Sequence, residues 1–488
     1  MAISWIDFGI IAAYLMAMLG IGYYIFRRNP NFEEYLIAGR SMTTPVLVCT
    51  LASTYYGLDV LFGTSELAFN NGVVAYFGYS VLYLVLYAIA AFVLSKRLRT
   101  ANFTSLPEIL ERNYGTGAAT FGALASIFYS IPALALFALG RISEVIFGVD
   151  AMIGAAAIGS IALVYTLWGG LWAVAITDTI QFVLMCVTLA IGIPLLLHEV
   201  GGFEAAAQII PPDHFDLLGN LPIWLLLAYV ATGLSVFVEP GFYQRIFAAK
   251  DYRQARNALL IAVVIWGTYD WLVVAGGMLA HSAMLQGILP ANLHPNDALL
   301  TAVTYALPVG FVGIFLAGVL ATSMSTVDSY TLVAGANMAY DLYRPLVKPD
   351  ITDQQLVKFT KRGVVVAWVL GFFLAFMFDR LMALWVFTAT ILTSTVFVPI
   401  FIGLYWKGRK TPLAGTLSCG LGLLSMIVYY LTIMNLGEPN ELYGTFIWTF
   451  ELGSTSISLW QEYALFFSLP MSVVGFLVGN LFGREAVK

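Results

Sequence analysis

Thirteen long apolar segments recur along the chain, and they constrain its fold more than any other feature. Each is long enough to cross a bilayer, because one membrane helix needs about 20 mostly apolar residues. Only 10% of the residues are charged and 60% are hydrophobic, whereas a soluble domain carries about 25% charged residues. We therefore expect an all-α integral membrane protein and exclude a soluble globular protein, a disordered chain and a nucleic-acid-binding protein. The segments are 4–26, 44–69, 73–95, 116–146, 151–168, 172–198, 221–245, 256–284, 309–342, 362–379, 381–405, 412–435 and 461–482.

The connections between these segments are too short to hold a soluble domain, so we expect one transmembrane domain over residues 1–488. Orientation follows from the lysines and arginines, which gather on the cytoplasmic side of membrane proteins. With the amino terminus outside and the carboxyl terminus inside, only Arg141 and Arg380 of the 23 basic residues fall towards the outside. This bias predicts a multi-pass protein of the plasma membrane. It also places Arg245 at the inner surface.

Two segments contain residues that should interrupt a helix. The second segment carries Gly57 and Gly63 among polar residues, and the seventh contains Glu239 followed by Pro240 and Gly241. Proline cannot continue the helical hydrogen bonds, and broken helices occur in membranes only where they line protein or water. Interrupted segments at matching positions of two halves indicate a transporter with inverted repeats. We expect five-helix repeats over about 44–198 and 221–405, with extra helices at 4–26, 412–435 and 461–482.

Acidic residues inside the apolar segments are the sharpest functional signal, because each is costly in a bilayer. Arg141 is the only comparable basic residue, so the acids cannot all form internal ion pairs. They must be protonated, face water or attract cations. Glu66 and Asp178 lie near predicted segment ends, where exposure to water is a sufficient explanation. The acids are Asp59, Glu66, Asp178, Glu239, Asp270 and Asp328.

The ninth segment adds a row of hydroxyl groups. Thr322, Ser325 and Thr326 share one helical face at spacings of three and four residues. Hydroxyls beside carbonyls that a broken helix leaves unpaired form a cage of hard oxygens, which suits a hard cation such as sodium. The alternative is that these side chains bond their own backbone or allow close helix packing.

Several short motifs, in order over nearly the whole chain, resemble the sodium/solute symporter family. That family includes sodium-coupled glucose, proline, pantothenate, sialic acid and choline carriers. The last third looks most like the choline-carrier branch, through Trp406-Lys-Gly408 and Gly437-Glu-Pro439. The other matching stretches are Tyr35-Leu-Ile-Ala-Gly-Arg-Ser41, Thr104-Ser-Leu-Pro-Glu108, Gly169-Gly-Leu-Trp-Ala-Val-Ala-Ile-Thr-Asp-Thr-Ile-Gln181, Tyr243-Gln-Arg245, Ala248-Ala-Lys250 and Met324-Ser-Thr-Val-Asp-Ser329.

The resemblance implies a leucine-transporter-like fold and a main sodium site between the second and ninth segments. Carried onto this chain, that site takes backbone carbonyls from Ser53 and Tyr56 and oxygens from Thr322, Ser325 and Thr326. Some relatives bind a second sodium. The corresponding second cation site here would use Asp178, Ser325 and Ser329, with Asp328 standing where a small neutral residue is expected.

The resemblance also places the solute at mid-membrane against the two broken segments. Asp59 and Glu239 fall there, with Tyr55 and Tyr79 as candidate neighbours. Carboxylates without basic partners favour a cationic or zwitterionic amine and disfavour an anion. Arg245 lies about 9 Å further along a helix than Glu239, so at the inner surface it would be a poor partner.

These observations predict a secondary active symporter that imports a small organic solute with sodium by alternating access. Its expected partners are the solute, sodium ions and the lipid bilayer, without an obligate protein partner. A proton-coupled symporter is the nearest alternative, since buried acids can carry protons. A membrane enzyme or a transporter-like sensor is the alternative of a different class. Against an enzyme, the segments show no nucleophile–base pair and no phosphate-binding loop.

Overall fold

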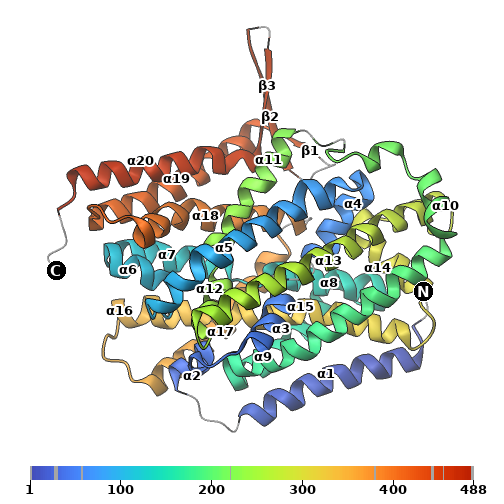
Figure 1. The fold of residues 1–488 in the computed structure, drawn as a ribbon, viewed down its shortest axis with the longest axis horizontal. Helices are drawn as coiled ribbons and strands as arrows, with labels where there is room; N and C mark the ends of the chain where they lie inside the picture. Colours follow the sequence, from blue (N-terminus) through green and yellow to red (C-terminus); the bar gives the residue numbers. More distant parts are fainter. Residues whose placement is uncertain are drawn as a thin grey trace.

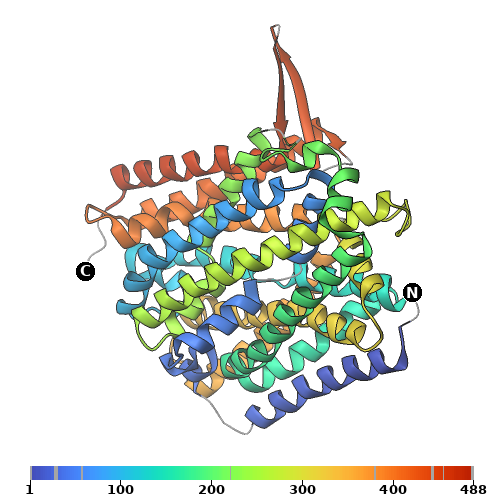
Figure 2. The ribbon, with the colours of Figure 1, turned by 45° about the vertical axis from the view of Figure 1, so that its right-hand side comes forward.

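The computed structural model describes residues 3–26, 31–55, 59–219, 221, 223–377, 381–440, 445–453 and 455–484. Most of them form helices that run side by side in one bundle (Figure 1). The start of α1 and the end of α20 lie at opposite ends of this bundle in both views (Figures 1 and 2). The bounds of the α-helices are α1 (Trp5–Phe26), α2 (Phe32–Ile37), α3 (Thr44–Tyr55), α4 (Ser65–Asn71), α5 (Val81–Thr100), α6 (Leu106–Tyr114), α7 (Thr116–Tyr129), α8 (Ala133–Phe147), α9 (Ala151–Glu199), α10 (Gly202–Ile209), α11 (Ile223–Thr232), α12 (Pro240–Ala248), α13 (Tyr252–Leu285), α14 (Pro295–Ala306), α15 (Phe311–Ala336), α16 (Arg344–Leu346), α17 (Asp353–Ala375), α18 (Leu381–Tyr405), α19 (Pro412–Leu436) and α20 (Ala464–Phe482).

Within the described residues, 10 helices are long and apolar enough to cross a membrane, or 11 when the broken pair at α3 and α4 counts as one span. The all-α membrane fold is therefore confirmed, whereas the number thirteen stays a prediction. Two expected segments, 151–168 and 172–198, lie within α9, on either side of the non-helical residue Gly170. The expected segment 362–379 overlaps α17, which is not among the ten. The division into two five-helix repeats also stays a prediction.

Both expected helix breaks are present. The second segment bends by 56° between α3 and the helix that continues into α4. In the seventh segment α11 runs into a short 3-10 helix, Gly233–Phe237, and α12 then begins at Pro240. Glu239 caps this new helix, because its carboxylate accepts hydrogen bonds from backbone N–H groups that have no partner within the helix. The two breaks create helix ends inside the bundle.

Helix α9 changes direction locally at Gly170, which has φ 57° and ψ −149°. A Cβ atom at this position would lie 2.4 Å from the backbone oxygen of Tyr35. Glycine is therefore required both by the positive φ and by the close approach of α2. Gly170 falls between the two expected segments that α9 joins.

Helix α15 occupies the centre of the bundle (Figure 1), and most of its residues are buried. Small residues bring neighbouring backbones close to it, as is common in membrane helix packing. A Cβ atom at Gly335 would lie 2.5 Å from the backbone nitrogen of Val364 on α17, and Gly363 faces Gly335 directly. The central position of α15 puts its hydroxyl row within reach of several other helices.

The connection between α19 and α20 contains a three-stranded antiparallel sheet. Its strands are β1 (Glu438–Asn440), β2 (Thr445–Leu452) and β3 (Thr455–Trp460), in the order β1-β2-β3. Ile447 pairs with both Glu438 and Trp460 across the two ladders. The β2–β3 hairpin projects beyond the helical bundle (Figure 2).

Candidate solute and sodium sites

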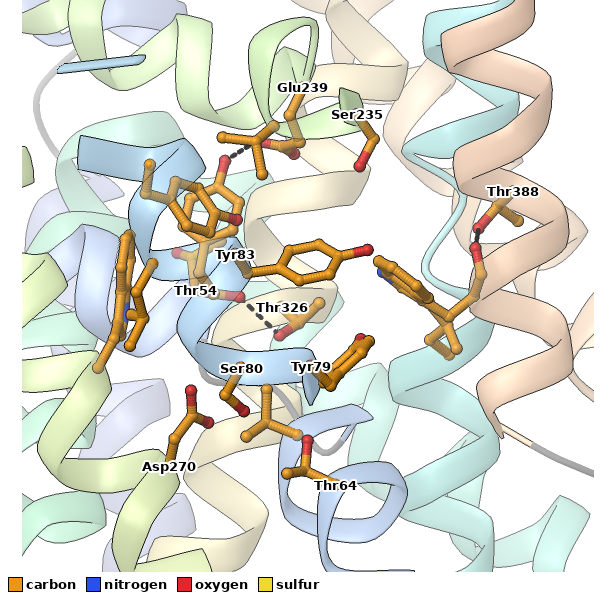
Figure 3. Close-up of a pocket in the computed structure, with 18 of the residues that line it drawn as sticks. Thr54, Thr64, Tyr79, Ser80, Tyr83, Ser235, Glu239, Asp270, Thr326 and Thr388 are labelled. Carbon is orange, nitrogen blue, oxygen red and sulfur yellow. Dashed lines mark hydrogen bonds between the residues drawn. The ribbon is translucent and has the colours of Figure 1, made fainter. Parts of the chain in front are cut away.

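A cavity of about 90 Å³ lies where the two broken helices meet α5, α13, α15 and α18 (Figure 3). One water needs roughly 10–15 Å³ on the same scale, so the cavity can hold several waters or a small organic molecule. Tyr55 and Tyr79, two of the expected solute residues, line it together with Glu239. The walls are largely aromatic: Tyr55, Tyr79, Tyr83, Tyr87, Tyr129, Trp266, Tyr330 and Trp385.

Glu239 is 2% exposed and marks one end of the cavity (Figure 3). Its Oε2 atom accepts hydrogen bonds from the Phe242 N–H at 2.6 Å and from the Tyr55 hydroxyl. Its Oε1 atom accepts one from the Gly241 N–H at 3.3 Å. The positive end of the α12 dipole also faces this carboxylate. Glu239 is thus held in place by the start of α12, and its carboxyl group borders the cavity.

Asp270 lies at the other end of the cavity and is 6% exposed (Figure 3). Sequence reasoning counted it among the intramembrane acids but did not assign it to the solute site. The available signal was its spacing from Trp266, since residues four apart share one face of a helix. Among the described residues that line the cavity there is no lysine or arginine.

The expected main sodium site brings the last turn of α3 against the hydroxyl row of α15. The Ser325 hydroxyl donates to the Ser53 carbonyl at 2.9 Å and to the Thr322 carbonyl at 3.0 Å. The Thr326 hydroxyl lies 3.2 Å from the carbonyls of Thr54 and Thr322. The Thr322 hydroxyl bonds the Val319 carbonyl instead. We name this group of oxygens the α3–α15 cradle.

The chemistry of the cradle suits a sodium ion. The last carbonyls of an α-helix have no intrahelical donor, and the negative end of the helix dipole points the same way. Neutral carbonyl and hydroxyl oxygens gathered there are hard ligands. Tyr56, the other expected carbonyl donor, lies outside the described residues, as does the side chain of Asp59.

The solute cavity and the cradle share two residues. Thr54 and Thr326 both line the cavity, and the hydrogen bond between the Thr326 hydroxyl and the Thr54 carbonyl joins α15 to α3 (Figure 3). Anything that rearranges the cradle therefore also moves one wall of the cavity.

The expected position of Arg245 at the inner surface is wrong, because this side chain is buried with 1% exposure. All of α12 is covered by other helices, so its arginine points into the protein. The Nη2 atom donates to the hydroxyls of Ser329 at 2.5 Å, Thr54 at 3.0 Å and Thr50 at 3.3 Å. The same atom lies 3.9 Å from Asp178 Oδ2. Arg141 is therefore not the only basic residue inside the bundle.

The three residues expected to form a second cation site gather around this guanidinium. Asp178 and Asp328 are both fully buried, so Asp178 is not a solvated helix-end acid. Asp328 accepts hydrogen bonds from the Tyr165 hydroxyl at 2.7 Å and the Ser329 hydroxyl at 3.1 Å. Within the described part of the chain, Asp178 Oδ1 has no hydrogen-bond partner. This cluster, which we call the Arg245 cluster, adjoins the cradle through Thr54.

Comparison with known proteins identifies a family. The model of the sodium:solute symporter family matches residues 35–421. Sodium/proline symporter 2 of Staphylococcus saprophyticus is 24% identical over 469 residues, covering 91% of this chain and 89% of the relative. The high-affinity proline transporter PutP of Bacillus subtilis is 25% identical over 455 residues, covering 87% and 92%.

Two solved structures share the fold. A substrate-bound, outward-open Na⁺-coupled sialic acid symporter aligns with a TM-score of 0.80 at 17% identity, over 99% of this chain and all of that one. The nucleobase-cation-symport-1 transporter Mhp1 in a closed conformation aligns with a TM-score of 0.51 at 14% identity, over 93% and 94%. At these identities the likeness concerns the fold alone.

Proposed function

Because the chain belongs to the sodium:solute symporter family, a family of multi-pass membrane transporters rather than enzymes, we propose that it imports a positively charged amine, cationic or zwitterionic, together with sodium. The observation that carries this proposal is the cavity wall. Two buried carboxylates, Glu239 and Asp270, face a space with aromatic sides. A cation is attracted both by carboxylates and by aromatic faces, whereas carboxylates repel an anion.

In this proposal the sodium ion binds in the α3–α15 cradle. Its ligands are the carbonyls of Ser53 and Thr322 and the hydroxyls of Ser325 and Thr326, with Tyr56 as a further carbonyl donor. The solute binds against Tyr55, Tyr79, Glu239 and Asp59, at the plasma membrane. The support comes from the contacts between the two helices and from the family relationship.

Sodium and solute binding are coupled through the shared wall. The hydroxyls of Ser325 and Thr326 bond the carbonyls of α3 directly. A sodium ion would be held by these same hydroxyl and carbonyl oxygens and would link α3 to α15. Since Thr54 and Thr326 also line the cavity, the ion sets the position of that wall for the solute. Alternating access then moves both ligands together.

For the second cation position we propose that the positive charge is the guanidinium of Arg245. Its Nη2 atom contacts the Ser329 hydroxyl at 2.5 Å and lies 3.9 Å from Asp178 Oδ2, and both residues belong to the expected second cation site. A resident cation leaves the α3–α15 cradle as the single sodium site, so one sodium ion is transported per solute.

The test is uptake into proteoliposomes under an inward sodium gradient, with potassium on both sides as the control. Labelled amines, amino acids, sugars and carboxylates are offered separately. We expect the sodium gradient to accelerate the uptake of amine-containing solutes only. Uptake that ignores the gradient, or uptake of an anion or a sugar in preference to amines, would contradict the proposal.

Proton coupling is the second candidate, and the buried pair of Asp178 and Asp328 favours it. With sodium absent, an inward proton gradient would then drive uptake that a protonophore abolishes. Sodium coupling predicts no such uptake.

A further inference from the structure

Glu239 fills the end of a broken helix that faces the solute cavity. In transporters with broken helices, the amino-terminal ends of the half-helices point at anionic groups of the substrate. Here the carboxylate of Glu239 accepts the N–H groups of Gly241 and Phe242 at that end of α12. The chain thus supplies its own carboxylate where a solute carboxylate would otherwise bind.

The hydrogen-bond capacity of Glu239 leaves room for a donor from the solute. An ionised carboxylate offers about four acceptor positions. Two backbone N–H groups and the Tyr55 hydroxyl use three of them. Oε1, which accepts only the long bond from Gly241, can still accept from an ammonium group. A carboxylate on the solute could only repel this group.

Asp270 provides a second negative charge at a distance from the first. The ring of Tyr55, whose hydroxyl bonds Glu239, packs against the ring of Trp266 with centroids 5.9 Å apart. Asp270 lies one further helical turn along α13, a rise of about 6 Å. Glu239 and Asp270 therefore face the two ends of one aromatic-walled space (Figure 3).

Arg245 attracts the Glu239 carboxylate from outside the cavity lining. The Nη2 atom of Arg245 is engaged with Ser329, Thr54 and Thr50, and Arg245 is not among the residues that line the cavity. An amino acid in this cavity would bury its carboxylate with no lysine or arginine among the described lining residues, which is costly in a dry site.

We propose that the solute is an aliphatic diamine without a carboxylate, with one ammonium group at Glu239 and the other at Asp270. The inference rests on the proposed function and narrows it. It distinguishes this chain from carriers of amino acids, which must bind one carboxylate and one amine. Here Glu239 and Asp270 would both bind positively charged groups.

The wild-type test compares each diamine with the amino acid that differs from it by one carboxylate. Putrescine is paired with ornithine and cadaverine with lysine, while butylamine lacks the second amine and proline represents the compact amino acids. Each competes with labelled putrescine for sodium-driven uptake in proteoliposomes. We expect each diamine to inhibit at a concentration at least tenfold lower than its amino-acid partner, and butylamine to be weaker than putrescine.

Two variants divide the recognition between the acids. Glu239→Gln keeps the shape and removes the charge, so the tenfold gap between putrescine and ornithine should shrink to less than threefold. Asp270→Asn should remove the preference for putrescine over butylamine and leave the exclusion of ornithine in place. Glu462→Gln is the matched control, because Glu462 is a buried acid outside the cavity, hydrogen-bonded to Thr445, and it should change neither ratio.

The outcomes separate this inference from the proposed function. Sodium-driven uptake of proline, ornithine or lysine at concentrations equal to or lower than those of the diamines would overturn the diamine assignment while sodium–amine symport stands. Absence of sodium-driven uptake for every amine would overturn both. The competition series uses the wild-type protein, so it decides the question even when a variant does not fold.

Discussion

Replacing Arg245 with glutamine tests whether its guanidinium balances the charge of Asp178. Both side chains are removed from water, with exposures of 1% and 0%, and Nη2 lies 3.9 Å from Oδ2. At an effective dielectric constant of about 20, two unit charges at this separation attract by about 4 kcal/mol. Measured losses when one partner of a buried pair is removed are about 3–5 kcal/mol. We therefore expect Arg245→Gln to lose about 4 kcal/mol of stability.

The loss should depend on sodium, because the variant leaves Asp178, Asp328 and Ser329 without their resident cation. A ligand at a hundred times its dissociation constant stabilises the folded state by about 2.7 kcal/mol. Sodium chloride, compared with potassium chloride, should thus raise the unfolding midpoint of Arg245→Gln more than that of the wild type. The double variant Arg245→Gln with Asp178→Asn should recover more than half of the loss.

The measurement is thermal unfolding of the purified proteins in detergent, with sodium or potassium as the only cation. Arg112→Gln is the control. Arg112 pairs with Glu108 at 2.5 Å but is 47% exposed, and exposed pairs contribute about 1 kcal/mol or less. An Arg245→Gln protein that unfolds at the wild-type midpoint in potassium would refute the charge balance. A double variant no more stable than the single one would refute the pairing with Asp178.

Three further predictions concern other parts of the site and fold. Ser325→Ala combined with Thr326→Ala should raise the sodium concentration for half-maximal uptake at least tenfold, or about 1.4 kcal/mol; an unchanged sodium dependence would remove these hydroxyls from the sodium site. Asp178→Asn alone should lower the uptake rate per molecule of folded carrier, and wild-type kinetics would leave Asp178 without a role in transport. Gly170→Ala should destabilise the protein by at least about 1–3 kcal/mol, because a positive φ costs that much for a non-glycine residue and the new Cβ atom would meet the Tyr35 carbonyl at 2.4 Å; an unchanged unfolding midpoint would contradict this.

The features that could be predicted from the sequence are those with a local signature. Apolar length marks a membrane helix wherever it occurs, so the helical membrane fold needed no tertiary information. Pro240 lacks an N–H group, and this alone breaks the seventh segment after Glu239. Thr322, Ser325 and Thr326 share a face through helical spacing, and the structure sets two of their hydroxyls against α3.

The features that escaped prediction depend on what covers each residue. The count of basic residues assigned Arg245 to the surface from its place near a segment end. In the structure all nine residues of α12 are buried, so a position near the end of the segment does not expose Arg245 to solvent. Asp270 looked like one of six acids, and only the packing of Trp266 against Tyr55 and Tyr87 shows which cavity it borders. The β2–β3 hairpin lacks the long apolar segment that marks a membrane helix. Its strands are stabilised by pairing with each other, which the apolar pattern does not predict.

The wall formed by Thr54 and Thr326 has a thermodynamic consequence for the transport cycle. Since both residues border the cavity and one hydrogen bond between them belongs to the cradle, a sodium ion in the cradle and a solute in the cavity would each change the free energy of binding the other. Linkage requires the two effects to be equal. Sodium raises the affinity for the solute by the same factor by which the solute raises the affinity for sodium. A solute that binds without this reciprocal gain would inhibit the carrier instead of being carried, so the ratio of the two apparent affinities distinguishes a cargo from a blocker.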